Sequence, residues 1–251
     1  LIGGFIATAF GKSAVFNIWG AVAVLGALVC VFMVKDSGAR VIPTKASLEG
    51  VPLVKPGYLG TFAAGCVIRS RGGVCSSFNN SLLPLYAVAM FDATPAMIGG
   101  VMFIHGLGLA FFNIPGGMLS DKVGRRLPAL AGSMVATAGV IWYCAADSFW
   151  PLFIAVGLAG AGSAFSTPAV AALAADVCDA RRRGEAFGYF LTSFNLGMVL
   201  GAFVFGLVSD ALGLWGAVLA WGLTSLALSL FGLLIREPDR QPVANAVMQK
   251  A

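Results

Sequence analysis

The sequence predicts an all-α membrane protein, a polytopic helical bundle with about seven full transmembrane helices. Of its 251 residues, 59% are hydrophobic and 11% are charged, whereas soluble domains carry about 25% charged residues. The mean hydropathy is +0.89, and the apolar residues form runs long enough to cross a bilayer core, which takes about 20 residues. This composition excludes an ordinary soluble domain, a disordered chain and a nucleic-acid-binding protein.

Short polar segments divide the chain into its predicted spans. Residues 1–10 are interpreted as the end of a span, because the chain starts at Leu1, without a methionine and inside an apolar run. We therefore expect a fragment of a longer protein. Full spans are predicted at 14–34, 58–91, 96–119, 127–146, 150–175, 185–208 and 214–235.

One long polar segment lies between the first two full spans. Residues 35–57 contain several prolines and charged side chains, which are typical of a linker. This linker separates an N-terminal part, residues 1–34, from a helical bundle at 58–235, and residues 236–251 form a tail.

Basic residues gather in alternate loops. Thirteen of the sixteen Lys and Arg residues lie in the linker, in the loops at 122–126 and 181–183, and in the tail. Loops rich in Lys and Arg stay in the cytoplasm. We therefore expect these segments and the C-terminus on the cytoplasmic side of the plasma (inner) membrane, in a multi-pass protein.

The sequence shows no pattern typical of a disulfide framework, a metal site or a catalytic site. The five cysteines are odd in number and mostly lie in apolar runs, which argues against a disulfide framework, and no two of them have metal-ligand spacing. The sequence contains neither a nucleophile–base pair nor the phosphate-binding pattern G-x-x-x-x-G-K-[ST]. We predict no cofactor, no metal site and no enzymatic activity.

The two ends of the chain resemble each other at a shift of 202 residues. Parallel repeats of membrane spans are typical of one large class of transporters. Glycine is abundant here, so chance matches are the alternative, which two Trp-Gly pairs at one offset disfavour. The matched pairs are Gly4 and Gly206, Ala9 and Ala211, Gly11 and Gly213, Trp19 and Trp221, and Gly20 and Gly222.

Residues 117–126, which read Gly-Met-Leu-Ser-Asp-Lys-Val-Gly-Arg-Arg, join two spans on the predicted cytoplasmic side. Gly117 is expected to let helices approach closely, and Gly124 is expected to permit a tight turn. We expect Asp121 to face the positive N-terminus of a neighbouring helix. Contacts made in one state and broken in another would form a conformational latch. Its basic anchors are Lys122, Arg125 and Arg126.

This loop resembles the G-x-L-x-D-[RK]-x-G-R-[RK] motif of the major facilitator superfamily at every position. The resemblance implies the end of one six-helix bundle (the end of span 5, and span 6), a central linker and a second six-helix bundle (spans 7–12), which work by alternating access. Leu83 to Tyr86 look like part of the family's seventh helix. Gly184 to Gly201 resemble its eleventh, where two Gly-x-x-x-Gly pairs predict packing seams. Leu1 to Gly4 resemble the end of a motif of proton antiporters.

Two arginines lie within the predicted span 58–91. Arg69 shares a helix face with Ser76 and Asn80, so we expect it to face a polar cavity. Arg71 shares a face with apolar side chains such as Phe78, so we expect it to face packing side chains or lipid headgroups. The alternative for both arginines is an anchor that snorkels to the inner membrane surface.

A histidine and uncharged polar residues complete the predicted pathway. His105 is the sole histidine and lies ~15 Å into its span. It could carry a coupled proton, and the alternative is a neutral imidazole bonded to the backbone. For the asparagines, the alternative is hydrogen bonding between helices. The predicted substrate or ion pathway comprises Arg69, Ser76, Asn79, Asn80, His105 and Asn195.

Three functions are compatible with these features. The family resemblance and the first four residues imply a secondary transporter for proton-coupled efflux of small drug-like or metabolite compounds. An arginine without a deep acidic partner suits a carboxylate, so uptake of a small organic anion is the second. The third is a non-transporting receptor or scaffold on the same fold. The predicted partners are a small-molecule substrate, a coupling proton, the lipid bilayer and the missing N-terminal half, with no nucleic acid.

Overall fold

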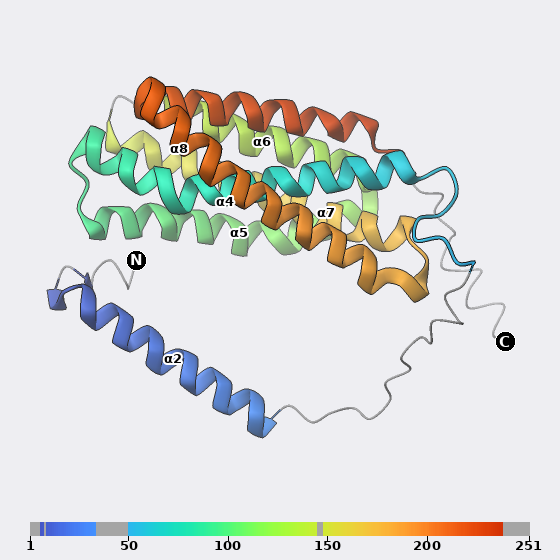
Figure 1. Cartoon of the computed structure of the whole chain (residues 1–251), viewed down its shortest axis with the longest axis horizontal. Coiled ribbons are helices and arrows are strands. Elements are labelled where there is room, and N and C mark those ends of the chain that lie inside the picture. Colours follow the sequence, from blue (N-terminus) through green and yellow to red (C-terminus); the bar gives the residue numbers. More distant parts are fainter. Residues whose placement is uncertain (1–5, 8, 34–49, 145–147, 238–251) are drawn as a thin grey trace.

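The computed structural model describes residues 6–7, 9–33, 50–144 and 148–237, most of which are helical (Figure 1). The described helices coincide with the predicted spans to within a few residues, so the all-α prediction is confirmed. Most of the predicted linker and tail lies outside the described residues. The α-helices are α2 (Lys12–Met33), α4 (Leu59–Phe91), α5 (Pro95–Val123), α6 (Arg126–Cys144), α7 (Phe149–Val177) and α8 (Arg183–Leu230), and the 3-10 helices are η1 (Ala180–Arg182) and η2 (Phe231–Leu234).

Helix α8 contains two predicted spans, which a single residue separates. Gly213 has φ 75° and ψ 172° and breaks the helix. Gly11, which the predicted repeat pairs with Gly213, has φ 83° and lies directly before α2. This left-handed region favours glycine. The shared conformation supports the repeat inferred from the sequence.

Local signals set the turn between α4 and α5. Asp92 ends α4 in the left-handed conformation, with φ 48°. Thr94 then caps α5, because its hydroxyl oxygen accepts a hydrogen bond from the Met97 amide at 3.3 Å. Pro95 follows at the first helical position, where its missing N–H costs nothing. This turn sends α5 back alongside the bundle.

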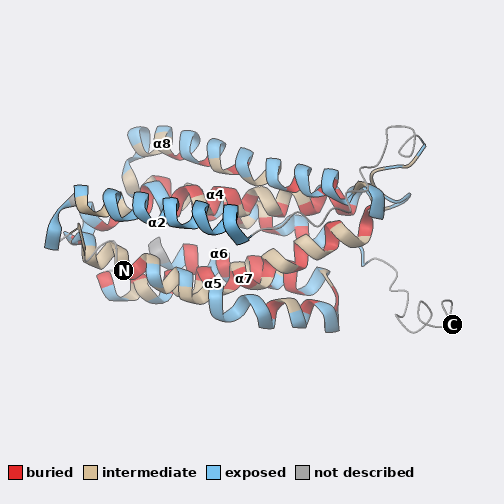
Figure 2. Ribbon diagram, turned by 90° about the horizontal axis from the view of Figure 1, so that it is seen from below, coloured by how far each residue is buried: buried red, intermediate tan, exposed pale blue. Residues whose placement is uncertain are grey.

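The bundle consists of two packed groups of helices. Helix α4 packs along α8, while α7 packs against both α5 and α6. Phe78 of α4 and Trp221 of α8 are buried and stacked, with ring centroids 3.8 Å apart. Figure 2 shows the buried residues on the inward faces of these helices.

Glycines set the closest approach of α4 and α8. A Cβ added to Gly73 would overlap the Phe194 carbonyl oxygen, and one added to Gly197 would overlap the Ser70 carbonyl oxygen. The Gly197–Gly201 pair thus forms the packing seam that the sequence predicted. The Gly184–Gly188 pair does not, because an added Cβ there meets nothing within 4 Å in the described part of the chain.

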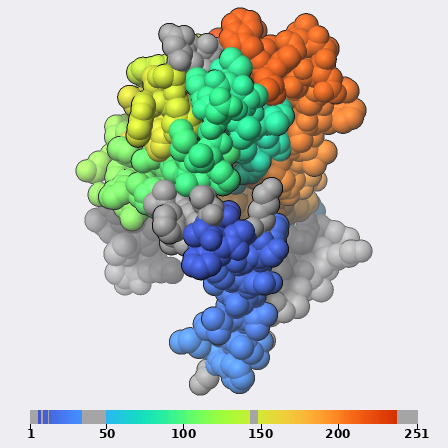
Figure 3. Space-filling model, turned by 90° about the vertical axis from the view of Figure 1, so that its left-hand side faces the viewer, coloured from blue at the N-terminus to red at the C-terminus, as the bar shows by residue number. Residues whose placement is uncertain are grey.

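The outer surface is apolar, as expected for a protein in a bilayer. Phe16, Phe111 and Phe203 are 77%, 70% and 66% exposed. Helix α2 lies outside the packed body of the other helices (Figure 3). Within the described residues, four segments are long and apolar enough to cross a membrane, so the seven predicted crossings stay a prediction. These segments are Ser13–Met33, Pro95–Val123, Phe149–Val177 and Ala180–Leu234.

Candidate functional site

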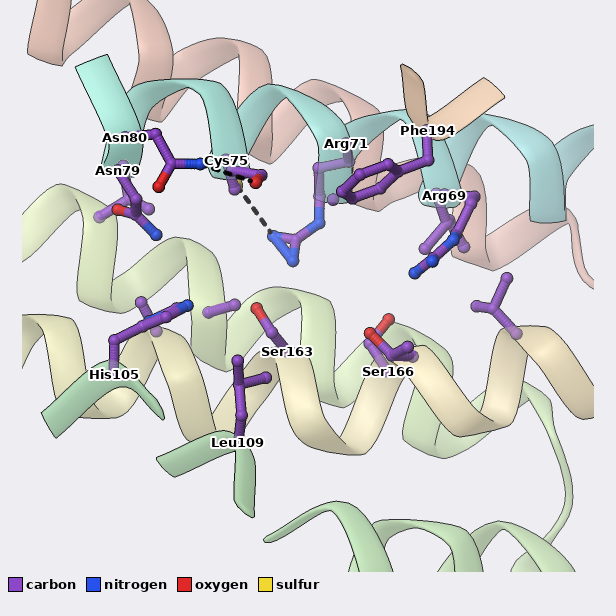
Figure 4. A pocket seen from close by; sticks show the side chains of 18 of the residues that line it. Arg69, Arg71, Cys75, Asn79, Asn80, His105, Leu109, Ser163, Ser166 and Phe194 are labelled. Atoms are coloured by element: carbon purple, nitrogen blue, oxygen red, sulfur yellow. Dashed lines mark hydrogen bonds between the residues drawn. The ribbon is translucent and has the colours of Figure 1, made fainter. Parts of the chain in front are cut away.

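A pocket of about 390 Å³ opens between α4 and the helices α5 and α7, with further walls from α6 and α8 (Figure 4). Its volume is in the range of small-molecule sites. Apolar walls surround a set of polar side chains, which is the usual composition of such sites. The polar lining residues are Arg69, Arg71, Ser76, Asn79, Asn80, His105, Ser163, Ser166 and Thr167.

One stripe of α4 forms the upper wall of the pocket. Ile68, Gly72, Cys75 and Asn79 line it at helical spacing. Because successive residues are rotated by about 100°, the side chains at 69 and 71 flank the stripe on opposite sides. Both are long enough to turn back toward the same space. This geometry places two guanidinium groups on one pocket.

Arg69 lies where the sequence predicted a polar environment. Its side chain is half-buried, lines the pocket with Ser76 and Asn80, and places its guanidinium carbon 4.7 Å from the centre of the Phe194 ring. Such a cation–π contact stabilises the charge by about 0.5–1 kcal/mol when exposed. Asn80 donates a hydrogen bond to the Ser76 hydroxyl at 3.3 Å.

For Arg71 the sequence left two surroundings open, packing side chains or lipid headgroups, and the structure places it among packing side chains. It is 2% exposed and lies inside the bundle. Its Nη1 contacts Ser225 Oγ at 3.3 Å and Cys75 Sγ at 3.8 Å, while its Nε is buried without a hydrogen-bond partner. The helix-face argument missed the pocket because it took no account of the length of this side chain.

His105 lines the pocket from α5, opposite the asparagines of α4 (Figure 4). Its Nδ1 lies 3.4 Å from the carbonyl oxygen of Val156. A carbonyl accepts and does not donate, so this contact holds the proton on Nδ1 and leaves Nε2 of a neutral ring as an acceptor. This contact agrees with the alternative given above for His105, a neutral imidazole bonded to the backbone.

Two of the three predicted asparagines line the pocket. Asn79 is 7% exposed and Asn80 is exposed, and both line the pocket. Asn195 is exposed on α8 and does not line it. The preceding residue, Phe194, takes the pocket-facing position of this helix turn, and the next residue is rotated about 100° away. The structure therefore brings together five of the six predicted pathway residues.

A chain of buried hydroxyls behind the pocket was not predicted. Thr137 Oγ1 lies 2.9 Å from Ser225 Oγ and 3.2 Å from Ser229 Oγ, which links α6 to α8. Ser133 and Ser166 are similarly joined at 3.1 Å. The signal was available, because Ser225 and Ser229 share one face of an otherwise apolar span. Among the described residues, no cluster of three or more His, Cys, Asp or Glu side chains could hold a metal ion.

At the basic end of the bundle, Arg125 joins the predicted latch to α7. Its Nη1 donates to Asp121 and its Nε donates to Asp176 Oδ2 at 2.9 Å. Burial lowers the pKa of the Arg125 guanidinium, but the hydrogen bonds and charges of Asp121 and Asp176 outweigh burial and raise the pKa above its ordinary value. Arg125 therefore stays charged at physiological pH.

Glu237 occupies the N-terminus of α6, because its carboxylate accepts the Arg125 and Arg126 amides at 3.1 and 2.6 Å. Asp121, which we expected to face the N-terminus of a neighbouring helix, pairs with Arg125. A carboxylate at a helix N-terminus is stabilised by the helix dipole. Arg126 also donates to the Leu233 carbonyl at 3.0 Å.

The close approach expected of Gly117 belongs to its neighbour. A Cβ on Gly116 would lie 2.8 Å from the Ala164 carbonyl oxygen, whereas the nearest atom to one on Gly117 is Pro168 Cβ at 4.0 Å. Lys122 is exposed in the last turn of α5. Which of two adjacent glycines faces the next helix depends on packing, which a motif does not reveal.

The last residues of the predicted linker are held at the same end of the bundle as Arg125. Lys55 donates from its amide to the Val177 carbonyl at 2.9 Å and from Nζ to the Asp176 carbonyl at 2.6 Å. Arg182 Nη1 donates to the Val51 carbonyl at 2.8 Å. These residues of the predicted linker therefore contact the end of α7 and the 3-10 helix η1 that follows it.

Gly124→Ala is expected to destabilise the protein by about 1–3 kcal/mol. Gly124 has φ 109°, and an added Cβ would lie 2.6 Å from the Glu237 carboxylate. Thermal unfolding of the full-length protein in detergent measures the change. Gly117→Ala is the matched control in the same motif, and equal destabilisation by both variants would contradict the prediction.

Comparison with known proteins identifies the family of this membrane-spanning helical fold. The sequence pattern of the Major Facilitator Superfamily matches residues 72–250. Inner membrane transport protein YajR of Escherichia coli is 34% identical over 127 residues, which are 49% of this chain and 28% of YajR. The uncharacterized MFS-type transporter MJ1560 of Methanocaldococcus jannaschii is 25% identical over 83% of this chain and 54% of its own length. Quinolone resistance protein NorA of Staphylococcus aureus is 24% identical over 51% of this chain and 33% of NorA.

Solved structures share the fold. The POT family transporter PepTSo superposes with a TM-score of 0.60 at 16% identity, covering 72% of this chain and 39% of PepTSo. A peptide transporter of the POT family (E310Q mutant), solved in complex with sulfate, gives 0.61 at 18% identity, covering 77% and 42%. This chain spans about half the length, or less, of the relatives it matches. With the family pattern matched over most of its length, this multi-pass membrane protein belongs to the major facilitator superfamily of transporters.

Proposed function

We propose that the full-length protein is a secondary transporter that moves small organic solutes by alternating access, and that the pocket is this chain's part of the pathway. The observation that carries the proposal is the pocket itself, which lies inside the bundle and combines apolar walls with polar groups from several helices. Transporter sites of this kind lie between helices near the bilayer midplane.

The proposed topology has seven crossings. Helix α2, helices α4 to α7 and the two parts of α8 before and after Gly213 supply them. Residues 1–34 end the N-terminal bundle, 35–57 form the linker, 58–235 form the C-terminal bundle, and 236–251 form the tail. The concentration of Lys and Arg in the linker, alternate loops and tail supports a cytoplasmic C-terminus in the plasma membrane.

Within this proposal, the latch of residues 117–126 holds one conformation of the cytoplasmic side. Arg125 supports it, because one guanidinium contacts both Asp121 on α5 and Asp176 on α7. Sliding of α5 against α7 would separate Asp176 from Arg125, while Asp121 would move with Arg125. A contact that is present in one state biases the equilibrium between states by its own free energy.

Proton-coupled efflux is the direction that we propose first. The similarity to NorA, whose name describes quinolone resistance, supports it. His105 lines the pocket, and its imidazole could carry a coupled proton. Uptake of an organic anion is the second candidate, and the two arginines of the pocket favour it.

Filling the pocket tests the transport proposal. Ser163→Trp adds an indole ring to the α7 wall, opposite the arginines, and should abolish solute flux in proteoliposomes while the protein still folds. A tryptophan at Ile154, an exposed residue of the same helix, is the control and should leave flux unchanged. Flux is measured with and without an imposed pH gradient. Undiminished flux in Ser163→Trp would contradict this pathway.

A further inference from the structure

We propose that the pocket binds the carboxylate group of a small organic anion, with Arg71 as its primary ligand and Arg69 as a second cation. The inference rests on the proposed transport function and names the substrate class of the same site. It reverses the ranking that the helix-face argument gave to the two arginines.

Arg71 is a buried cation with neutral partners. Its side chain is 2% exposed, and within the described residues its contacts are Ser225 Oγ and Cys75 Sγ, at 3.3 and 3.8 Å from Nη1. The Nε atom is buried without a partner. Its guanidinium therefore carries a positive charge that neither of these contacts balances.

A buried charge without a counter-charge is costly, and an opposite charge placed beside it offsets the cost. The pocket lining contains no Asp or Glu among the described residues. The described carboxylates of this chain occupy helix ends and loops, as Asp121 and Asp176 do. The guanidinium therefore needs an anionic oxygen that the described chain does not supply, and a bound ligand can supply it.

Arg69 adds a second positive charge to the same space. It is held over the Phe194 ring at 4.7 Å from the ring centre, which orients it without neutralising it. In Figure 4 both arginines project from α4 toward the Ser163 and Ser166 hydroxyls of α7. An anion between them would meet guanidinium groups on one side and hydroxyl donors on the other.

The shapes of the groups favour a carboxylate on an apolar body. The planar fork of a guanidinium matches a carboxylate through two parallel hydrogen bonds. Around the charged groups, the walls are apolar, with Met102, Leu109 and Val140 among the lining residues. A ligand with one anionic end and an apolar remainder fits both parts of the pocket.

The test compares benzoate with benzamide, which has nearly the same shape and no charge. Thermal unfolding of the purified full-length protein in detergent is followed with each probe, with inorganic phosphate, and with chloride at equal ionic strength. We expect benzoate to raise the melting temperature and benzamide, phosphate and chloride to leave it near the buffer value, because a ligand that binds the folded state stabilises it.

Variants separate an anion ligand from a structural arginine. Arg71→Gln removes an uncompensated charge, so its melting temperature without ligand should equal or exceed that of the wild type, and its response to benzoate should vanish. Arg71→Lys keeps the charge but loses the fork, so benzoate should bind about tenfold more weakly. Arg69→Gln should weaken benzoate binding, but benzoate should still raise the melting temperature of this variant. Arg183→Gln, at the exposed start of α8, is the charge-matched control.

Four results would overturn the inference. Equal stabilisation by benzamide would show that charge is not recognised, and stabilisation by phosphate or chloride alone would show a different anion. A lower melting temperature for Arg71→Gln with an intact benzoate response would make Arg71 structural. If benzoate fails while Ser163→Trp still abolishes flux, the transport proposal stands and the carboxylate assignment fails.

Discussion

Gly197→Ala is expected to destabilise the protein by about 3 kcal/mol, the upper end of the usual cost of overpacking. The added methyl group would overlap the Ser70 carbonyl oxygen and would also crowd the Ser70 Cα at 3.0 Å. These are backbone atoms of α4, so no side-chain rotation relieves the overlap, and α4 and α8 must move apart. Thermal unfolding of the full-length protein in detergent measures the loss.

The matched control lies on the same helix. Gly188 belongs to the other Gly-x-x-x-Gly pair, and an added Cβ there meets nothing within 4 Å among the described residues. Gly188→Ala should leave stability unchanged or raise it by about 0.5–1 kcal/mol, because alanine is the better helix former. Equal melting temperatures for the two alanine variants would contradict the assignment of the seam.

Arg125→Gln is expected to reduce the rate of solute transport by about tenfold, which corresponds to about 1.4 kcal/mol. The substitution removes the contacts to Asp121 and Asp176 and leaves two carboxylates near each other. The Asp121 side chain is 70% exposed, so its pair contributes little. The less exposed pair with Asp176 supplies most of the effect. Flux into proteoliposomes and hydrogen exchange at the amides of residues 117–126 are the measurements.

A partial variant and a control make this test specific. Asp176→Asn keeps an acceptor for the Arg125 Nε and removes one charge, so its loss of transport should be smaller than that of Arg125→Gln. Arg183→Gln removes an exposed basic residue at the same end of the bundle and should transport normally. If Arg125→Gln transported at the wild-type rate with unchanged exchange, the loop would be a topological anchor and no latch.

Gly124 and Glu237 show what the motif at residues 117–126 could and could not predict. The sequence correctly indicated a loop in which Gly124 turns the chain, since φ 109° is a conformation that glycine adopts readily. It did not indicate Glu237, which lies more than a hundred residues later and accepts the amides at the start of α6. A motif records residues that are adjacent in sequence, whereas this contact depends on where the chain returns after α8.

By itself, the sequence determined where the helices lie and to which fold they belong. Runs of about 20 apolar residues between prolines, glycines and charged loops can satisfy their backbone only as helices in a bilayer, so their bounds follow from local composition. Helix periodicity also placed Arg69 with Ser76 and Asn80. The tertiary structure decided that Arg71 joins this pocket and that Asn195 does not. Periodicity gives the angle of a side chain around its own helix, but the packed neighbours and the reach of a long side chain decide what it contacts.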